Sequence, residues 1–165
     1  MKCAVFPALL FVFLLQLDVS AQGPAKRGEA LRTLKVCSTR PMTLNCNEDT
    51  AGYLIGLYKH GDRSLLRPLL DAGRHSDGAL AELLGDYYSD VLTARPRSFL
   101  LSLNSRSLKQ QRHLCWMAGA TDGGGMNAST LRKARRSLRG FSSDKNLAGV
   151  ARICMSEVNR VNPEH

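Results

Sequence analysis

The fold is decided by the segment GALAELLGDYYSDVLT, which spans residues 78–93. Its large apolar side chains recur at i, i+3, i+4, i+7, i+8, i+11 and i+12, and they are Leu80, Leu83, Leu84, Tyr87, Tyr88, Val91 and Leu92. Apolar residues with this spacing cover one face of an α-helix, which must be buried against other elements. Ser76 or Asp77 can cap the start of this helix. Pro96, just beyond its end, suits the first position of a second helix.

Most of the chain after residue 49 shows the same helical periodicity. We expect further helices over residues 50–59, from Pro96 to Leu103, and over 107–119, 129–140 and about 144–161. Residues 63–72 are harder to assign, because Pro68 would break a long helix. Alternating runs of β-branched and aromatic residues, which are typical of strands, are absent. The sequence therefore predicts an all-α fold: a single domain of six or seven short amphipathic helices.

Residues 1–21 have the organisation of a secretory signal peptide. Lys2 gives a positive start, an apolar run follows, and Val19-Ser20-Ala21 resembles a signal peptidase site. The apolar run is shorter than the ~20 residues that a membrane-spanning helix needs, and Asp18 ends it. We predict cleavage before Gln22, a secreted or periplasmic mature protein, and no stable membrane insertion after cleavage.

The mature chain would begin with a stretch that does not look like part of the core. Residues 22–48 are rich in polar residues and helix breakers, so we expect a mobile N-terminal arm followed by a loop between Cys37 and Cys46. The helical domain would then occupy residues 49–165.

Cleavage would also change the cysteine content. It removes Cys3 and leaves four cysteines, Cys37, Cys46, Cys115 and Cys154. An even number in an exported chain favours two disulfides, although four cysteines allow three pairings and the sequence does not choose among them. We favour Cys37–Cys46, which closes a short loop, together with Cys115–Cys154, which joins two helices. A zinc site is less favoured, since there is no C-x-x-C and no paired histidine, and we expect neither a metal nor a cofactor.

Charge is distributed unevenly along the chain. The formal net charge is +9, and residues 48–90 carry −4 whereas residues 95–140 carry +9. On the helix predicted near 129–139, Leu131, Ala134 and Leu138 share one side. The basic side chains fall within an arc of about 160°, and they are Arg132, Lys133, Arg135, Arg136 and Arg139. Such a face attracts an acidic macromolecule or anionic surface, although a solvated surface helix would show the same pattern.

The acidic segment contains its own periodic feature. Glu82, Asp86 and Asp90 recur every fourth residue, so they form a carboxylate stripe beside the apolar one. Like charges at this spacing repel each other by a few tenths of a kcal/mol. We expect the stripe to face basic groups or water, with internal pairing to the basic segment or cation binding as alternatives.

Signals for catalysis are weak. His60, His75 and His113 are the candidate acids or bases of a small secreted hydrolase, in particular one that cleaves phosphodiesters. However, no spacing brings two of them together, and no catalytic signature is present. The glycine-rich loop at 122–125 lacks the surrounding pattern of a phosphate-binding loop and is expected to be a connector.

Two further residues are candidates for surface roles. Trp116 follows Cys115, so we expect it to be half-buried at the edge of the core or to act as an interface anchor. Asn127-Ala128-Ser129 is a glycosylation sequon, which matters only where exported proteins are glycosylated.

The sequence thus favours a binding protein over an enzyme. We expect a basic helical module that recognises an acidic partner, which would be a protein surface, a glycan, lipopolysaccharide or a nucleic acid. The alternatives are the hydrolase and a structural envelope protein without a ligand.

Overall fold

A computed structural model describes residues 18–39, 48–121 and 124–162, with side chains from residue 23 onward. These residues form eight α-helices and one short 3-10 helix, and no strand occurs among them, so the predicted all-α class is confirmed. The elements are α1 (Asp18–Cys37), α2 (Glu48–Lys59), η1 (Arg63–Leu65), α3 (Leu66–Ala72), α4 (Gly78–Ala94), α5 (Pro96–Asn104), α6 (Leu108–Gly119), α7 (Ala128–Arg139) and α8 (Ala148–Val161).

The local signals from residue 78 onward act as expected. Pro96 is the first residue of α5, where its missing N–H costs no hydrogen bond. The hydroxyl of Ser107 accepts a hydrogen bond from the backbone N–H of Gln110 and caps α6. The last helix begins at Ala148 rather than near Asp144, because the intervening residues form turns. Pro68 lies in the first turn of α3, where proline is tolerated, so residues 63–72 form η1 and α3 instead of one long helix.

The structure differs from the expectation of a mobile arm at residues 22–37, which belong to helix α1. The helix-breaking residues Gly23, Pro24 and Gly28 predict a break in this segment. Beyond them, Ala30, Leu31 and Leu34 form a short apolar stripe that packs against the core. Arg27 fixes the helix further, since its Nε lies 2.6 Å from the Oδ2 atom of Asp62. The sequence predicted six or seven helices, whereas the described residues form eight α-helices. The difference arises because α1 was not predicted and α3 was uncertain.

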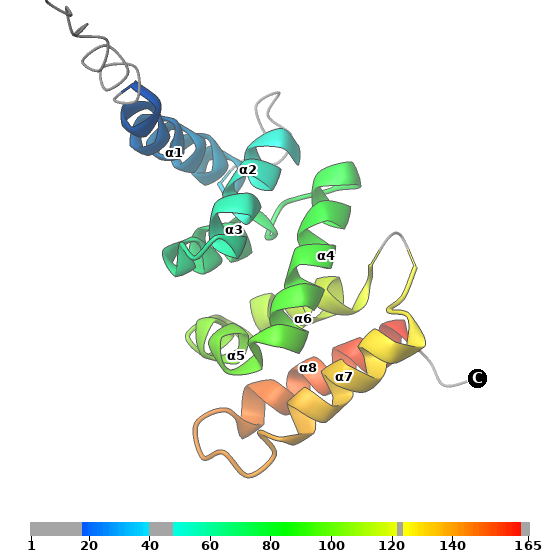
Figure 1. Ribbon diagram of the computed structural model, residues 1–165. Helices are drawn as coiled ribbons and strands as arrows, with labels where there is room; N and C mark the ends of the chain where they lie inside the picture. Colours follow the sequence, from blue (N-terminus) through cyan, green and yellow to red (C-terminus); the bar gives the residue numbers. More distant parts are fainter. Residues whose placement is uncertain (1–17, 40–47, 122–123, 163–165) are drawn as a thin grey trace, which may run out of the picture.

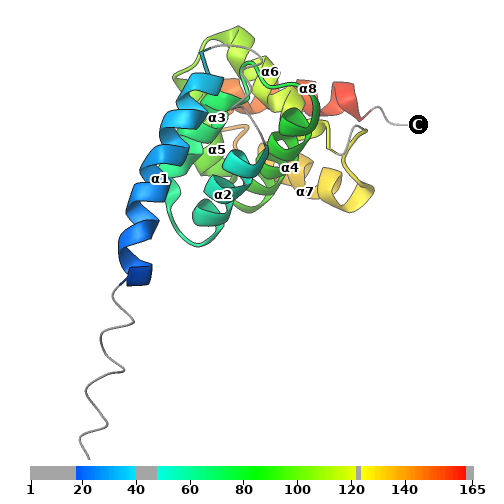
Figure 2. The same ribbon diagram turned by 90° about the horizontal axis from the view of Figure 1, so that it is seen from above.

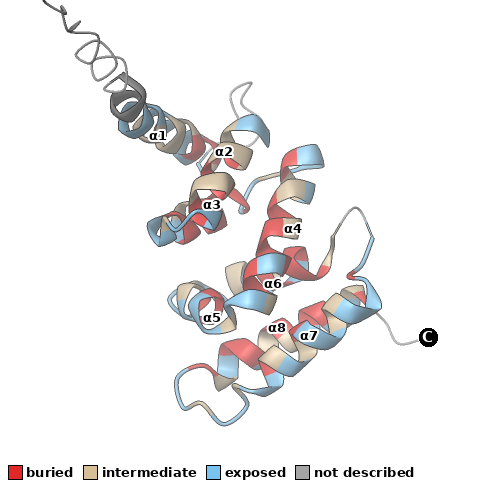
Figure 3. Ribbon diagram, viewed as in Figure 1, coloured by how far each residue is buried: buried red, intermediate tan, exposed pale blue. Residues whose placement is uncertain are grey.

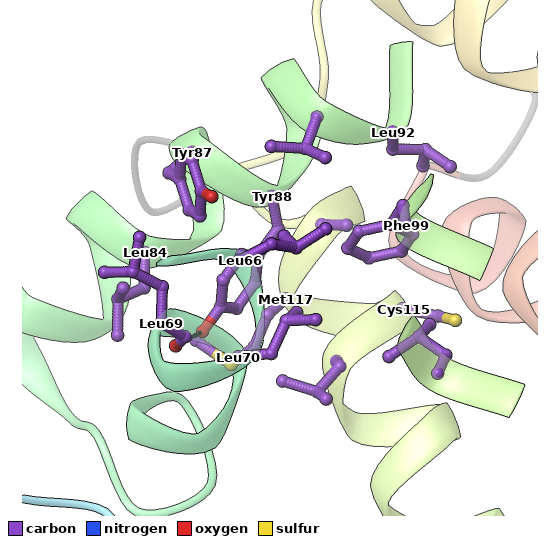
Figure 4. Packing of buried hydrophobic residues seen from close by; sticks show 14 of the residues in the cluster. Leu66, Leu69, Leu70, Leu84, Tyr87, Tyr88, Leu92, Phe99, Cys115 and Met117 are labelled. Carbon is purple, nitrogen blue, oxygen red and sulfur yellow. Dashed lines mark hydrogen bonds between the residues drawn. The ribbon is translucent and has the colours of Figure 1, made fainter. Parts of the chain in front are cut away.

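The helices pack around one hydrophobic core in a single domain. Figure 1 shows α1, α2 and α3 grouped together, α4 and α6 in the middle, and α7 running alongside α8. Figure 2, seen from above, places α7 on the opposite side of the molecule from α1. Figure 4 shows the centre of the core, where side chains of α3, α4, α5 and α6 meet around Tyr88 and Phe99.

Two glycines permit close approach between the backbones of neighbouring helices. A Cβ atom on Gly85 of α4 would lie 2.9 Å from the carbonyl oxygen of Ala120, at the end of α6. A Cβ atom on Gly119 would lie 3.1 Å from the Cα atom of Val158 in α8. Since backbone atoms cannot move aside as a flexible side chain can, these positions favour glycine.

One of the two predicted disulfides, Cys115–Cys154, is present in the structure and joins α6 to α8 within the core. Cys37 is buried at the end of α1, whereas Cys46 lies outside the described residues, so the Cys37–Cys46 pair stays a prediction. Most of the predicted signal peptide, residues 1–17, also lies outside them. In the described part of the chain, none of the helices has the length and apolar character needed to cross a membrane.

Candidate polyanion-binding helix

Helix α7 presents one side to the core and the other to solvent. Its first turn is capped by Asn127, whose Oδ1 atom accepts a hydrogen bond of 3.0 Å from the backbone N–H of Thr130. Ala134 and Leu138 are buried, and Leu131 is half-buried against the core. The helix packs on α4 and α8 through this side. Its basic residues are therefore held on the outside by the burial of the apolar ones.

Four of the five predicted basic residues are exposed on this outer side, and they are Arg132, Lys133, Arg136 and Arg139. At 100° per residue they cover an arc of about 120°. No ion pair within the described residues joins any of them to an acidic side chain. We call these four residues the cationic face. Figure 3 shows the exposed residues along the outer side of α7.

Arg135 differs from the other four. It is half-buried at the edge facing α8, where its Nε donates a hydrogen bond of 2.8 Å to the Oδ1 atom of Asn159. The helical wheel of α7 places Arg135 next to the cationic face, but only the packed structure shows that α8 engages its guanidinium. No sequence pattern relates Asn159 to Arg135, because the two lie on different helices.

The cationic face carries an electrostatic cost. Among the five basic residues of α7, five pairs are spaced i, i+3 or i, i+4. Each such pair of like charges destabilises a helix by about 0.2–0.5 kcal/mol. Arg136 and Arg139 lie in the last turn, where the helix dipole favours positive charge and offsets part of the repulsion. A bound polyanion would relieve the remainder.

The turn that follows α7 is fixed by Asp144. Its Oδ1 atom accepts hydrogen bonds of 3.0 Å and 3.2 Å from the backbone N–H groups of Asn146 and Leu147, and its Oδ2 atom lies 3.1 Å from Nη1 of Arg97. The pKa of Asp144 is lowered, chiefly by the hydrogen bond from Asn146. A stable carboxylate therefore holds the α7–α8 connection in place.

The acidic stripe of α4 lies near the beginning of α7, away from its last turn. Asp86 and Asp90 line a hollow together with Asn127 and Thr130 of the α7 N-terminal turn. Asp90 pairs with Lys59 of α2 at 3.2 Å, and Glu82 is exposed. No three histidine, cysteine, aspartate or glutamate side chains gather as a metal would require in the described part of the chain.

The candidate catalytic histidines have separate surroundings. His113 donates from Nε2 to the carbonyl oxygen of Gly73 at 2.9 Å and stacks on Trp116, which is 41% exposed. His60 and His75 are exposed, and no hydrogen bond or ring contact between described residues joins two histidines.

The two remaining candidates flank the start of α7. Asn127, the sequon residue, is exposed, and the Ser129 hydroxyl donates to its Oδ1 atom at 2.8 Å. Of the glycine-rich loop, Asp122 and Gly123 lie outside the described residues, and the Thr121 hydroxyl donates to the carbonyl oxygen of Gly125 at 3.1 Å.

Comparisons with known proteins give no further guide to the site: the sequence matches no protein-family model, and neither curated proteins nor solved structures gave a match.

Proposed function

We propose that this protein is a secreted or periplasmic binding module whose cationic face recognises an acidic macromolecule. The observation that carries the proposal is the group of four exposed basic side chains on α7, none paired with an acidic residue among those described. A helix that is fixed to the core by Ala134 and Leu138 offers these charges without a large ordering cost on binding. The face has no aromatic side chains, which favours a charged backbone or headgroup over stacked bases.

The location of the protein forms part of the same proposal. The buried Cys115–Cys154 disulfide is compatible with an oxidising compartment outside the cytoplasm. N-terminal sequencing of the exported protein tests it directly, and we expect the mature chain to begin at Gln22. A mature protein that retains residues 1–21 would contradict the export assignment. Cleavage before Gln22 would place Pro24 within the first turn of α1, where its missing N–H is tolerated.

Binding is tested with three defined polyanions: heparin, vesicles that contain phosphatidylglycerol, and a DNA duplex. The test variant replaces Arg132, Lys133, Arg136 and Arg139 by Gln. The control variant replaces Lys35, Lys109, Lys145 and Arg152, four exposed basic residues on other parts of the surface, and has the same net charge. We expect at least one probe to bind the wild type and the control but to lose most of its affinity for the test variant. Equal binding to both variants would refute the role of α7.

A further inference from the structure

A second candidate site lies beside the last turns of α4 and includes no residue of the cationic face. A cavity of about 300 Å³ is bounded by the end of α2, by η1 and by the last turns of α4. Its lining includes the aromatic rings of Tyr58 and Tyr87, the apolar Val91 and Ala94, and the basic Arg63 and Arg95. Such a mixture of apolar walls and a few polar groups is typical of a site for a small molecule.

The Tyr87 ring forms part of the wall of this cavity. Tyr87 is 2% exposed, and its hydroxyl has no hydrogen-bond partner among the described residues. The neighbouring Tyr88, in contrast, donates from its hydroxyl to the carbonyl oxygen of Leu69 at 2.6 Å, and Figure 4 shows both rings on α4. This hydroxyl is enclosed by protein atoms, so the ring of Tyr87, and not its hydroxyl, lines the cavity. Burial raises the pKa of Tyr87.

Arg63 is held in position over the ring of Tyr58. Its Nη1 donates to the carbonyl oxygen of Tyr58 at 2.6 Å, and its guanidinium carbon lies 4.8 Å from the centre of the Tyr58 ring. That ring meets Tyr87 edge-to-face, with 5.3 Å between the ring centres. Arg63 thus lies over one of the two aromatic rings of the cavity, and it has donors beyond the one used by Tyr58.

The charge of the cavity favours an anion. Lys59 and Asp90 also line it, but they pair with each other at 3.2 Å, which leaves the two arginines without a matching acid. Arg95 directly precedes α5, whose N-terminus has no side-chain cap and adds a partial positive charge. Guanidinium groups bind carboxylates well because the two groups match in geometry.

We propose that this cavity binds a small organic carboxylate, with its carboxylate group held by Arg63 and Arg95. The apolar body of the ligand would lie against the tyrosine rings, Val91 and Ala94. This inference is independent of the function proposed for α7, because the two sites share no residue.

The test is an NMR titration of the protein with benzoate and hexanoate, with benzamide and inorganic phosphate as comparison probes. We expect at least one of the two carboxylates to bind with a dissociation constant below about 1 mM. The Arg63→Gln and Arg95→Gln variants should each weaken this binding by about 10- to 100-fold, as for the loss of a hydrogen bond to a charged group. Arg152→Gln, on α8, is the control and should bind as the wild type does.

The absence of saturable carboxylate binding, unchanged binding in both site variants, or equally tight binding of benzamide or phosphate would overturn the proposal.

Discussion

Replacing both Cys115 and Cys154 by Ala should destabilise the protein strongly. The two residues are 39 positions apart, and a cross-link that closes a loop of this length stabilises the folded state by about 4 kcal/mol in the chain-entropy account. Both side chains are fully buried between α6 and α8, so their truncation also loses packing, which acts in the same direction. For a chain of this size, 4 kcal/mol corresponds to a fall in Tm of about 8–16 °C.

Urea unfolding, followed by circular dichroism at 222 nm, measures the change in the free energy of unfolding. The variant is preferable to a reducing agent, because a reductant would also break the predicted Cys37–Cys46 pair. The same pair can be tested on the variant: if it exists, adding a reductant should destabilise the variant further. A variant that unfolds within about 1 kcal/mol of the wild type would refute the view that this bridge is a main support of the α6–α8 contact.

Four other outcomes follow from local contacts. Gly85→Ala should lower the free energy of unfolding by about 1–3 kcal/mol, because its Cβ would lie 2.9 Å and 3.0 Å from two backbone carbonyl oxygens of the α6 segment. Gly56→Ala in α2, with open space around it, should instead raise the free energy of unfolding by up to about 1 kcal/mol in the same urea assay. Asn127→Ala should cost about 1 kcal/mol through loss of the α7 cap, and a smaller loss than about 0.3 kcal/mol would contradict that role. Adding NaCl should raise the Tm of the wild type more than that of the variant with four Gln residues on the cationic face, since salt screens the repulsion within α7. The pKa of Asp62 is lowered by its hydrogen bond from Arg27, so this pair contributes stability above about pH 4 that is lost as the pH falls through the folded pKa; an NMR titration should place the midpoint below about 3.9, and Arg27→Gln should raise it.

Local sequence signals predicted the helices that have a long apolar stripe or a clear cap. The apolar residues of α4, the proline that begins α5 and the serine that caps α6 all act within a few residues of the chain, so they can be identified without a structure. Helix α1 was missed because its stabilising contacts are distant in sequence, as in the pairing of Arg27 with Asp62. Propensity within residues 22–28 indicates a break, and tertiary packing overrides it.

The candidate sites show the same division between local and distant contacts. The helical wheel of α7 identified the basic face, yet it could not show that Asn159 engages Arg135 and removes it from the exposed group. The cavity beside Tyr87 was not predicted at all. In the sequence Tyr87 is one member of the apolar stripe, and only the folded chain brings Tyr87 and Arg63 to the same cavity.

The salt dependence of polyanion binding tests the central claim most directly. The association constant for a DNA duplex should fall with increasing salt for the wild type, and replacing the four residues of the cationic face by Gln should make the slope of log K against log salt shallower by about three to four. The charge-matched control, with Gln at Lys35, Lys109, Lys145 and Arg152, should keep most of the wild-type slope. Equal slopes for the two variants would show that net charge alone governs binding and that α7 is an ordinary solvated helix.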